Sequence, residues 1–217
     1  NLGGDFGIIG NEPASPFAKG KSYGLELMYQ QKLIKGFYGI MSLTFAMSQF
    51  EDKNHSYIPS AWDSRSIFNM TAGKRFRRNW EIGINWRFQS GLPYTPNLAE
   101  SNLKLAWDIN GKALLDYNQI NSLRSQAINQ IDFRIDKKWF FKQWNLNLYL
   151  DVENVTGSSI PSKTLILDRP LDPNNQPIGG PIIENPNAPL SEQRYKVKEI
   201  KDNVGVRLPS IGITIEF

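Results

Sequence analysis

Seven segments of this 217-residue chain alternate apolar and polar residues with a period of two. The clearest is 80–89, WEIGINWRFQ, in which large apolar side chains occupy every second position. Successive side chains of an extended strand point to opposite faces, so the pattern predicts strands with one apolar and one polar face. The other six segments lie at 23–30, 41–48, 68–76, 131–136, 145–153 and 211–217. No long segment shows the helical period of 3.6, so we expect an all-β fold.

The connections between these segments alternate between short and long. The short ones lie near 33–36, 77–79 and 140–143. The long ones are polar stretches at 50–65, 90–128 and 155–206. Loops of that length are uncommon in a compact domain. Antiparallel up-and-down strands would place every short turn at one end of the sheet, as in transmembrane β-barrels, where the long loops are extracellular.

Aromatic and cationic residues gather around the short turns. The rings beside them are those of Phe37, Tyr38, Phe76, Trp80, Trp139, Phe140, Phe141 and Trp144. The cations within them are Lys35, Arg77, Arg78 and Lys142. Rings at one height next to long cationic side chains are typical of the girdle at a membrane interface. The alternative is a β-sandwich with an aromatic edge, because aromatic residues are common in any strand.

Charged residues lie on the polar rows of the predicted strands. They are Glu26, Glu81, Arg87, Asp132, Arg134, Asp136, Asp151 and Glu153. A charge facing lipid costs about 2–4 kcal/mol near the midplane, so these residues are predicted to face the barrel lumen. They would line a substrate path or form cross-strand pairs that set the register. In either case we expect Arg87 and Arg134 to lie between carboxylates of adjoining strands.

The long loops contain residues suited to stacking on ligands and hydrogen bonding with them. The candidates are Trp62, Asp63, Arg65, Tyr94 and Trp107. Binding residues concentrate on loops held by a rigid scaffold, although the same side chains could simply pack the loops together. The stretch 170–189 is rich in proline, asparagine and glycine and is expected to turn repeatedly without regular pairing.

Composition excludes several classes of protein. Lys+Arg 25 against Asp+Glu 21 is a mild excess spread along the chain, so nucleic acid is not a predicted partner. Cysteine is absent and His55 is the single histidine, so we expect no metal site and no cofactor. The chain contains no run of about 18 apolar residues, so no transmembrane helix is predicted. We expect a protein that is not an enzyme; a hydrolase would require Glu81, Asp132, Asp136 or Asp151 to line a pocket.

Several stretches, in order, resemble the C-terminal part of TonB-dependent outer-membrane receptors, most closely those of Bacteroidetes. They are KGKSYG (19–24), IPSAWDSRSIFNMTAGKRF (58–76), NWEIGINWRFQSGLPYTP (79–96), IDFRIDKKWFFKQWNLNLYLDVENV (131–155) and LPSIGITIEF (208–217). The final strand ending in Phe217 is similar to the C-terminal signal for barrel assembly. The resemblance spans most of the chain and is weakest in 156–206.

The resemblance implies an antiparallel up-and-down transmembrane β-barrel in the cell outer membrane of a Gram-negative bacterium. Residues 1–217 would be a C-terminal fragment of about seven strands, with 1–18 an extracellular loop. Such receptors have 22-stranded barrels closed by an N-terminal plug, and we expect no plug domain within residues 1–217. Implied partners are outer-membrane lipid, the plug and remaining strands, the TonB complex, a surface lipoprotein, and a scarce nutrient such as a siderophore, vitamin, oligosaccharide or peptide.

Two alternatives remain open at the level of the sequence. One is a porin-like outer-membrane channel, which a missing plug would favour. The other is a secreted β-sandwich that binds carbohydrate through aromatic platforms in its loops. Solubility without detergent would separate the sandwich from either barrel.

Overall fold

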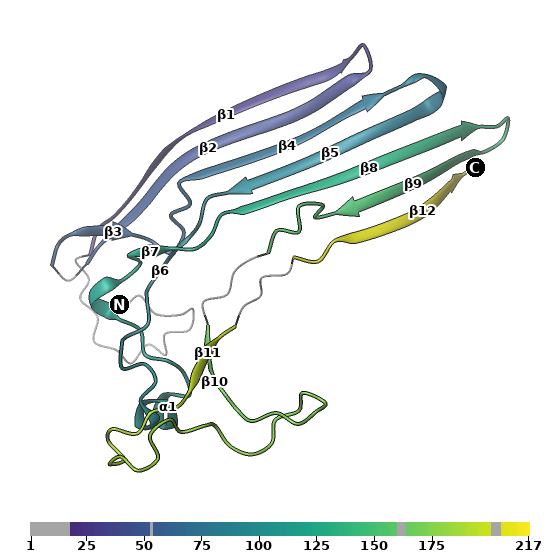
Figure 1. The fold of residues 1–217 in the computed structure, drawn as a ribbon. Helices are drawn as coiled ribbons and strands as arrows, with labels where there is room; N and C mark the ends of the chain where they lie inside the picture. The colour runs from purple at the N-terminus through teal and green to yellow at the C-terminus, as the bar shows by residue number, and fades with distance from the viewer. Residues whose placement is uncertain (1–17, 53, 160–163, 201–204) are drawn as a thin grey trace. The chain divides into compact units, whose positions relative to one another are not determined.

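The computed structural model describes residues 18–52, 54–159, 164–200 and 205–217. Its main feature is an eight-stranded antiparallel sheet in the order β1-β2-β4-β5-β8-β9-β12, with β3 beside β2 (Figure 1). The strands are β1 (Gly20–Ile34), β2 (Phe37–Glu51), β3 (Tyr57–Pro59), β4 (Ser66–Arg75), β5 (Trp80–Gln89), β8 (Ile128–Phe140), β9 (Asn145–Glu153) and β12 (Leu208–Glu216).

The seven long strands coincide with the seven predicted segments, and each lies beside its neighbours in chain order. The prediction of an all-β antiparallel fold is therefore confirmed. Several strands extend beyond their alternating segments: β1 and β2 have 15 residues each. In the described part of the chain the sheet is open, because β1 and β12 each pair with a single neighbour. Barrel closure stays a prediction.

Three tight connections lie at one end of the sheet, which we call the turn end (Figure 1). Lys35 and Gly36 join β1 to β2, and both have positive φ, 50° and 85°. The 3-10 turn η1 (Arg77–Asn79) joins β4 to β5, and residues 141–144 join β8 to β9. Glycine suits position 36 because the φ of Gly36 is in the left-handed region and a Cβ there would meet the Arg75 carbonyl.

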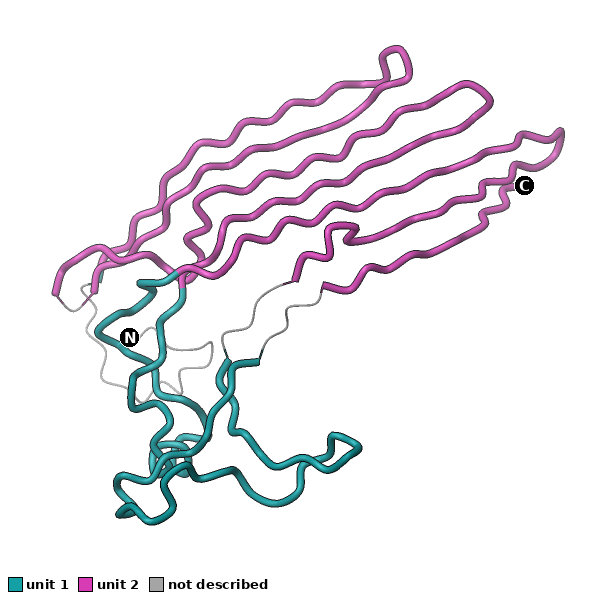
Figure 2. Tube along the Cα trace, viewed as in Figure 1, with its two compact units in different colours: residues 1–18, 94–123, 161–202 teal, residues 19–93, 124–160, 203–217 magenta. Residues whose placement is uncertain are grey.

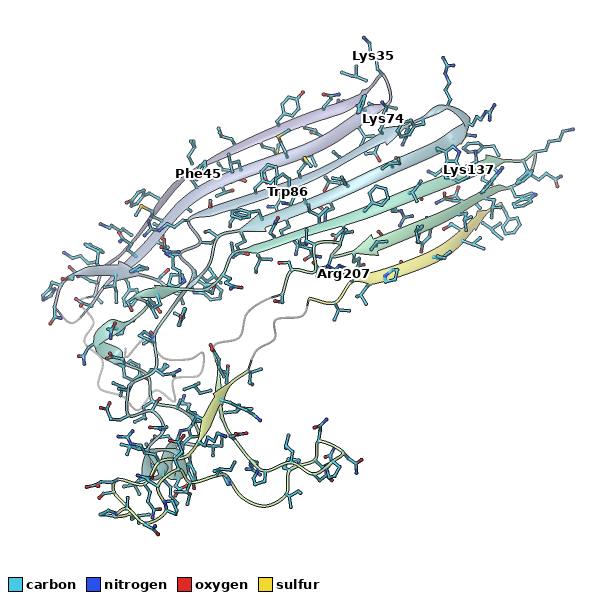
Figure 3. The ribbon with its side chains drawn as sticks, in the orientation of Figure 1. Lys35, Phe45, Lys74, Trp86, Lys137 and Arg207 are labelled. Atoms are coloured by element: carbon cyan, nitrogen blue, oxygen red, sulfur yellow. The ribbon has the colours of Figure 1, made fainter. Side chains whose placement is uncertain are left out.

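Strand register sorts the side chains of the long strands into two faces. Residues directly opposite across neighbouring strands point the same way, so each register row gives a row of one face. The apolar face contains rows such as Leu27↔Leu43↔Phe68↔Phe88. Phe45 and Trp86, labelled in Figure 3, belong to this face. Its larger side chains are widely exposed, including Leu27 at 53% and Ile211 at 76%.

The described residues supply no conventional protein core behind the apolar face. Among the described residues, the buried hydrophobic side chains are Trp107 and Tyr195, and both lie outside the main sheet. A soluble sheet normally packs one apolar face against another element. This sheet instead presents its leucines, isoleucines and aromatic rings outward along much of its surface.

The chain divides into two compact units (Figure 2). One contains the main sheet, and the other contains 94–123 and the described part of 161–202. The smaller elements are β6 (Pro93–Tyr94), α1 (Lys104–Asn110), η2 (Tyr117–Gln119), β7 (Leu123–Arg124), β10 (Leu165–Leu167) and β11 (Val197–Glu199). Stretches predicted only as loops thus contain short elements, because β10 pairs with β11 and isolated bridges join other segments.

The stretch 170–189 has no strand, and its backbone pairing is limited to isolated bridges such as Leu171↔Pro177. The only α-helix in the part of the chain that the structure describes is α1, with seven residues. No helix in those ranges is both long and apolar enough to cross a membrane. The loop predicted at 1–18 lies outside the described residues, apart from Ala18.

Candidate functional site

The polar face of the sheet brings together the eight charged residues that the alternation singled out. They are Glu26, Glu81, Arg87, Asp132, Arg134, Asp136, Asp151 and Glu153. They come from β1, β5, β8 and β9, and register places all of them on the face opposite to the leucine rows. The polar face is therefore the first candidate site.

Asp132 is the centre of one hydrogen-bond network on this face. Its Oδ2 accepts from Asn85 Nδ2 at 3.1 Å, and Asn85 Oδ1 accepts from Thr71 Oγ1 at 3.1 Å. Its Oδ1 accepts from Gln130 Nε2 at 3.0 Å and from the Asn154 backbone N–H at 2.8 Å. The network spans β4, β5 and β8 and ties them to the start of the loop that follows β9. Hydrogen bonds to a carboxylate are stronger than neutral ones, so this network stiffens the polar face.

Asp136 is the centre of a second network. Arg134 donates to both carboxylate oxygens, at 2.9 and 3.0 Å, and Asn147 Nδ2 donates to Oδ1 at 2.9 Å. The Arg134 guanidinium also lies 3.9 Å from the centre of the Tyr149 ring. That ring covers Gly212 on β12, where a Cβ would overlap it. A bidentate, stacked arginine links β8, β9 and β12 in one layer.

Glu81 is held by a third group of side chains near the turn end. Tyr38 Oη donates to Glu81 Oε1, and Arg75 Nε donates to Oε2 at 3.2 Å. The Tyr38 ring covers Gly73, again leaving no room for a Cβ. Glu81 is also the register partner of Asp136. Two carboxylates directly opposite would repel, and the separate arginine of each offsets that repulsion.

Arg87 and Arg134 were both expected to lie between carboxylates of adjoining strands, and the structure differs from that expectation. Arg134 has Asp151 as its register partner on β9, but its direct ion pair is with Asp136 on its own strand. Arg87 has Asn69 and Gln130 as register partners, so no carboxylate stands directly opposite it. The expectation that Arg87 lies between carboxylates is wrong, because the residue directly across on β8 is an amide. Its charge still lies close enough to interact with Asp132.

Four of the eight residues keep their charged ends available. Glu26, Arg87, Asp151 and Glu153 form no side-chain hydrogen bond or ion pair with any other residue of the described part. Glu81, Asp132, Arg134 and Asp136 are occupied by neighbours. The polar face therefore combines an internally bonded layer with charged groups that take no part in its hydrogen bonds.

Asp63 anchors the loops at the opposite end of the sheet. It is 1% exposed. Its Oδ1 accepts from the Ser48 backbone N–H at 2.6 Å, and its Oδ2 accepts from Arg65 Nε at 2.7 Å and from Arg124 Nη2. Arg124 Nη1 donates to the carbonyls of Asp63 and Gly91, at 2.7 and 3.0 Å. We call Asp63, Arg65 and Arg124 the loop clasp.

The loop clasp keeps Asp63 ionised. Burial raises the pKa of this carboxyl. The hydrogen bonds from Arg65, Ser48 and Arg124 lower the pKa by more than burial raises it, so the pKa lies below its usual value of 3.8. Arg124 was not a candidate from the sequence, since it lies 61 residues from its partner. Asp63 and Arg65 bind one another, and Asp63 also binds the backbone of Ser48; their role as ligand contacts stays a prediction.

The loop aromatics differ in exposure. Trp62 is 68% exposed and presents its ring to solvent. Tyr94 is half-buried in β6. Trp107 is 7% exposed, and its Nε1 donates to the Ser101 carbonyl at 2.7 Å. The ring fills the small interior of its unit, together with Tyr195, and its role as a ligand platform stays a prediction.

Within the described ranges, no group of three or more histidine, cysteine, aspartate or glutamate side chains is arranged to hold a metal ion. Comparison with protein-family models, with curated proteins and with solved structures finds no match for the chain.

Proposed function

We propose that the main sheet is part of the wall of an outer-membrane β-barrel, and that the barrel is a TonB-dependent receptor. In this proposal the receptor takes up a scarce solute, such as a siderophore, vitamin, oligosaccharide or peptide, with energy from the TonB complex. The observation that carries the proposal is the two-faced sheet, in which the apolar face is exposed and the polar face is internally bonded.

The exposed apolar face supports a lipid environment. Burying one leucine or isoleucine side chain is worth about 1.5–3 kcal/mol, so a face of this kind is stable only when something apolar covers it. A β-sandwich would supply a second sheet of comparable size. In the described part of the chain the other sheets have two strands each, so the sandwich alternative has little support.

The opposite face supports a water-filled lumen. Its carboxylates and arginines would be costly in hydrocarbon, whereas water and neighbouring donors satisfy them in a lumen. Strands of nine to fifteen residues are long enough to cross an outer membrane, for which about 9–11 residues suffice. Aromatic rings and cations around the turn end match the girdle expected at the periplasmic interface.

Open edges on β1 and β12 support the idea that further strands complete the wall. An unpaired edge promotes association with another strand. We propose that the remaining strands and the plug of the receptor pair with or fill this sheet. The end of β12, with Phe217, would then carry the barrel-assembly signal.

Insertion into lipid tests the membrane part of the proposal. The chain is refolded into phosphatidylcholine vesicles with lipids brominated in the middle of the acyl chain, and tryptophan fluorescence is recorded. Trp86 lies on the apolar face, so we expect strong quenching that falls in a Trp86→Phe variant. A chain that is monodisperse and β-rich in buffer without detergent would contradict the proposal.

Solute uptake tests the receptor part. Disrupting the gene in its host should reduce growth when one scarce solute limits it, and the uptake should stop when the proton gradient is dissipated. Uptake that continues without the gradient would favour the porin-like alternative instead.

A further inference from the structure

The apolar face carries two lysines close to the turn end, Lys74 on β4 and Lys137 on β8. Elsewhere near this end, the rows of that face in the described strands contain apolar or aromatic side chains, glycine and one uncharged polar residue, Gln31 on β1. Figure 3 labels both lysines at the turn end, together with Lys35. A cation in a lipid-facing row needs a partner, because its charge is costly in hydrocarbon.

Both lysines are half-buried against aromatic rings. Lys74 Nζ lies 4.1 Å from the centre of the Phe37 ring and 5.1 Å from that of Phe76. Lys137 Nζ lies 5.3 Å from the centre of the Trp80 ring and 5.4 Å from that of Trp139. The rings therefore hold each ammonium group near the surface by cation–π contact.

The turn between β4 and β5 adds two arginines between these lysines. Arg77 and Arg78 are exposed in η1, and Lys137 Nζ donates to the Arg78 carbonyl. Strand β5 alone separates β4 from β8, so the lysines stand on strands about 10 Å apart. We call Lys74, Arg77, Arg78 and Lys137 the cationic patch.

No carboxylate neutralises the cationic patch within the described ranges. The nearest acidic residues in register, Glu81 and Asp136, lie on the opposite face and are paired with Arg75 and Arg134. The cationic patch thus has four positive charges and no acidic partner in the described ranges, and it lies beside rings typical of a membrane interface. A ligand that fits it has an anionic group and an apolar tail.

We infer that the cationic patch binds the phosphate group of an anionic phospholipid in the leaflet at the turn end. The acyl chains lie along the apolar face, and the phosphate lies between Lys74, Lys137 and the η1 arginines. This inference rests on the proposed function, since it requires the apolar face to be in lipid. Its ligand is a lipid rather than free phosphate because the apolar rows continue directly from the patch.

Lipid selectivity in detergent micelles tests the inference. The full chain is titrated with phosphatidylglycerol or with phosphatidylcholine of the same acyl chains, and bound lipid is counted by native mass spectrometry. One basic residue at an anionic surface is worth about 1 kcal/mol, so we expect Lys74→Gln and Lys137→Gln each to weaken phosphatidylglycerol binding about fivefold. Phosphatidylcholine binding should change less than twofold.

Lys138→Gln is the matched control. Lys138 is next to Lys137 on the same strand, but register puts it on the polar face, so the variant removes the same charge and should not change lipid binding. Lys137→Arg keeps both the charge and the ring contacts and should preserve binding. Circular dichroism of each variant separates loss of binding from loss of folding.

Three results would overturn the inference: equal affinity for the two lipids, an equal loss in Lys138→Gln, or competition by inorganic phosphate at the lipid's own concentration. The proposed function fails differently. In that case the chain does not insert into vesicles of any composition, and mid-chain bromine leaves Trp86 fluorescence unchanged. Insertion without selectivity would reject the lipid site alone.

Discussion

At the scale of single residues, buried polar groups hold the strands and loops together where a hydrophobic core would otherwise do so. Asp63 accepts from the backbone of β2 and from Arg65 and Arg124. Tyr38 and Tyr149 cover glycines on neighbouring strands. Such contacts are specific in geometry, so single substitutions should have local and measurable effects.

The loop clasp should lose its ion pairs only at low pH, when Asp63 becomes protonated. The pKa of Asp63 is below 3.8 in the folded chain, so its ionised form stabilises the fold above that pH and the contribution is lost as pH falls through the folded pKa. We expect residues 60–65 to resist pepsin at pH 5 and to become cleavable only below about 3.8.

Asp63→Asn is the comparison for that experiment. It leaves the partly exposed Arg65 and Arg124 without their carboxylate, and loss of charge-assisted hydrogen bonds costs about 1.5–3 kcal/mol. Cleavage of 60–65 should be fast in this variant already at pH 5. Resistance equal to that of the unchanged chain would show that the loop clasp does not hold the loops.

Gly73→Ala should destabilise the sheet through the Tyr38 ring. A Cβ at Gly73 would overlap the ring, which must then move and loosen its hydrogen bond to Glu81. Overpacking of this kind costs about 1–3 kcal/mol, which we expect in the free energy of unfolding measured in detergent. Gly83, the register partner of Gly73, is the control, because the nearest atom to its Cβ would be 4.0 Å away. Equal effects of Gly73→Ala and Gly83→Ala would contradict this account.

At the scale of secondary-structure elements, the long strands separate apolar from polar side chains. Period-two alternation places apolar side chains on one face, and the register of every neighbouring pair keeps that face continuous from β1 to β12. The tight turns and the networks around Asp132 and Asp136 hold the register. A one-residue slip would exchange the two faces, so these contacts protect the sorting.

Leu27→Arg and Met28→Arg should differ sharply if the apolar face is in lipid. The two residues are adjacent in the middle of β1, on opposite faces, and are 53% and 69% exposed. We expect Leu27→Arg to cost about 2–4 kcal/mol in the free energy of folding into vesicles, and Met28→Arg under about 1 kcal/mol. In a sheet that faces water on both sides, both costs would be near zero. Equal small costs would therefore count against the membrane proposal.

At the scale of the whole molecule, the chain consists of two units that are stabilised differently. The unit with the main sheet is held by strand pairing and by the hydrogen-bond networks of its polar face. The other unit has a small interior of its own, in which Trp107 packs and Tyr195 Oη donates to Asp108 Oδ1 at 2.9 Å. Lys104 pairs with the same carboxylate and lowers its pKa, together with Tyr195.

Trp107→Ala should unfold the second unit locally. It removes one of the two buried hydrophobic side chains in the described part of this unit and a hydrogen bond to Ser101, and loss of a buried tryptophan costs about 3–5 kcal/mol. Hydrogen exchange at the amides of Gly111 and Tyr195 should speed up markedly. Leu105→Ala, on the same helix and 47% exposed, should leave both amides protected. Comparable acceleration in the two variants would contradict a Trp107-centred interior.

The sequence by itself determined the strands, their order and the division of their faces. These follow from the chemistry of neighbouring residues: 80–89 alternates strictly, tight turns pair β1 with β2, β4 with β5 and β8 with β9, and the alternation of short and long connections predicts the up-and-down order of the rest. The eight charged residues of the polar face were predictable for the same reason, because alternate residues of a strand point to opposite faces.

Tertiary structure alone decided which of those charges are occupied and which loop residues are buried. Arg124 meets Asp63 across 61 residues, and the bonding of Glu81 to Tyr38 spans 43. Trp107 and Trp62 look alike in the sequence, yet one is buried and the other exposed. Contacts of this kind depend on how distant segments are brought together, and no local period encodes them, because a period reports only the face of one strand.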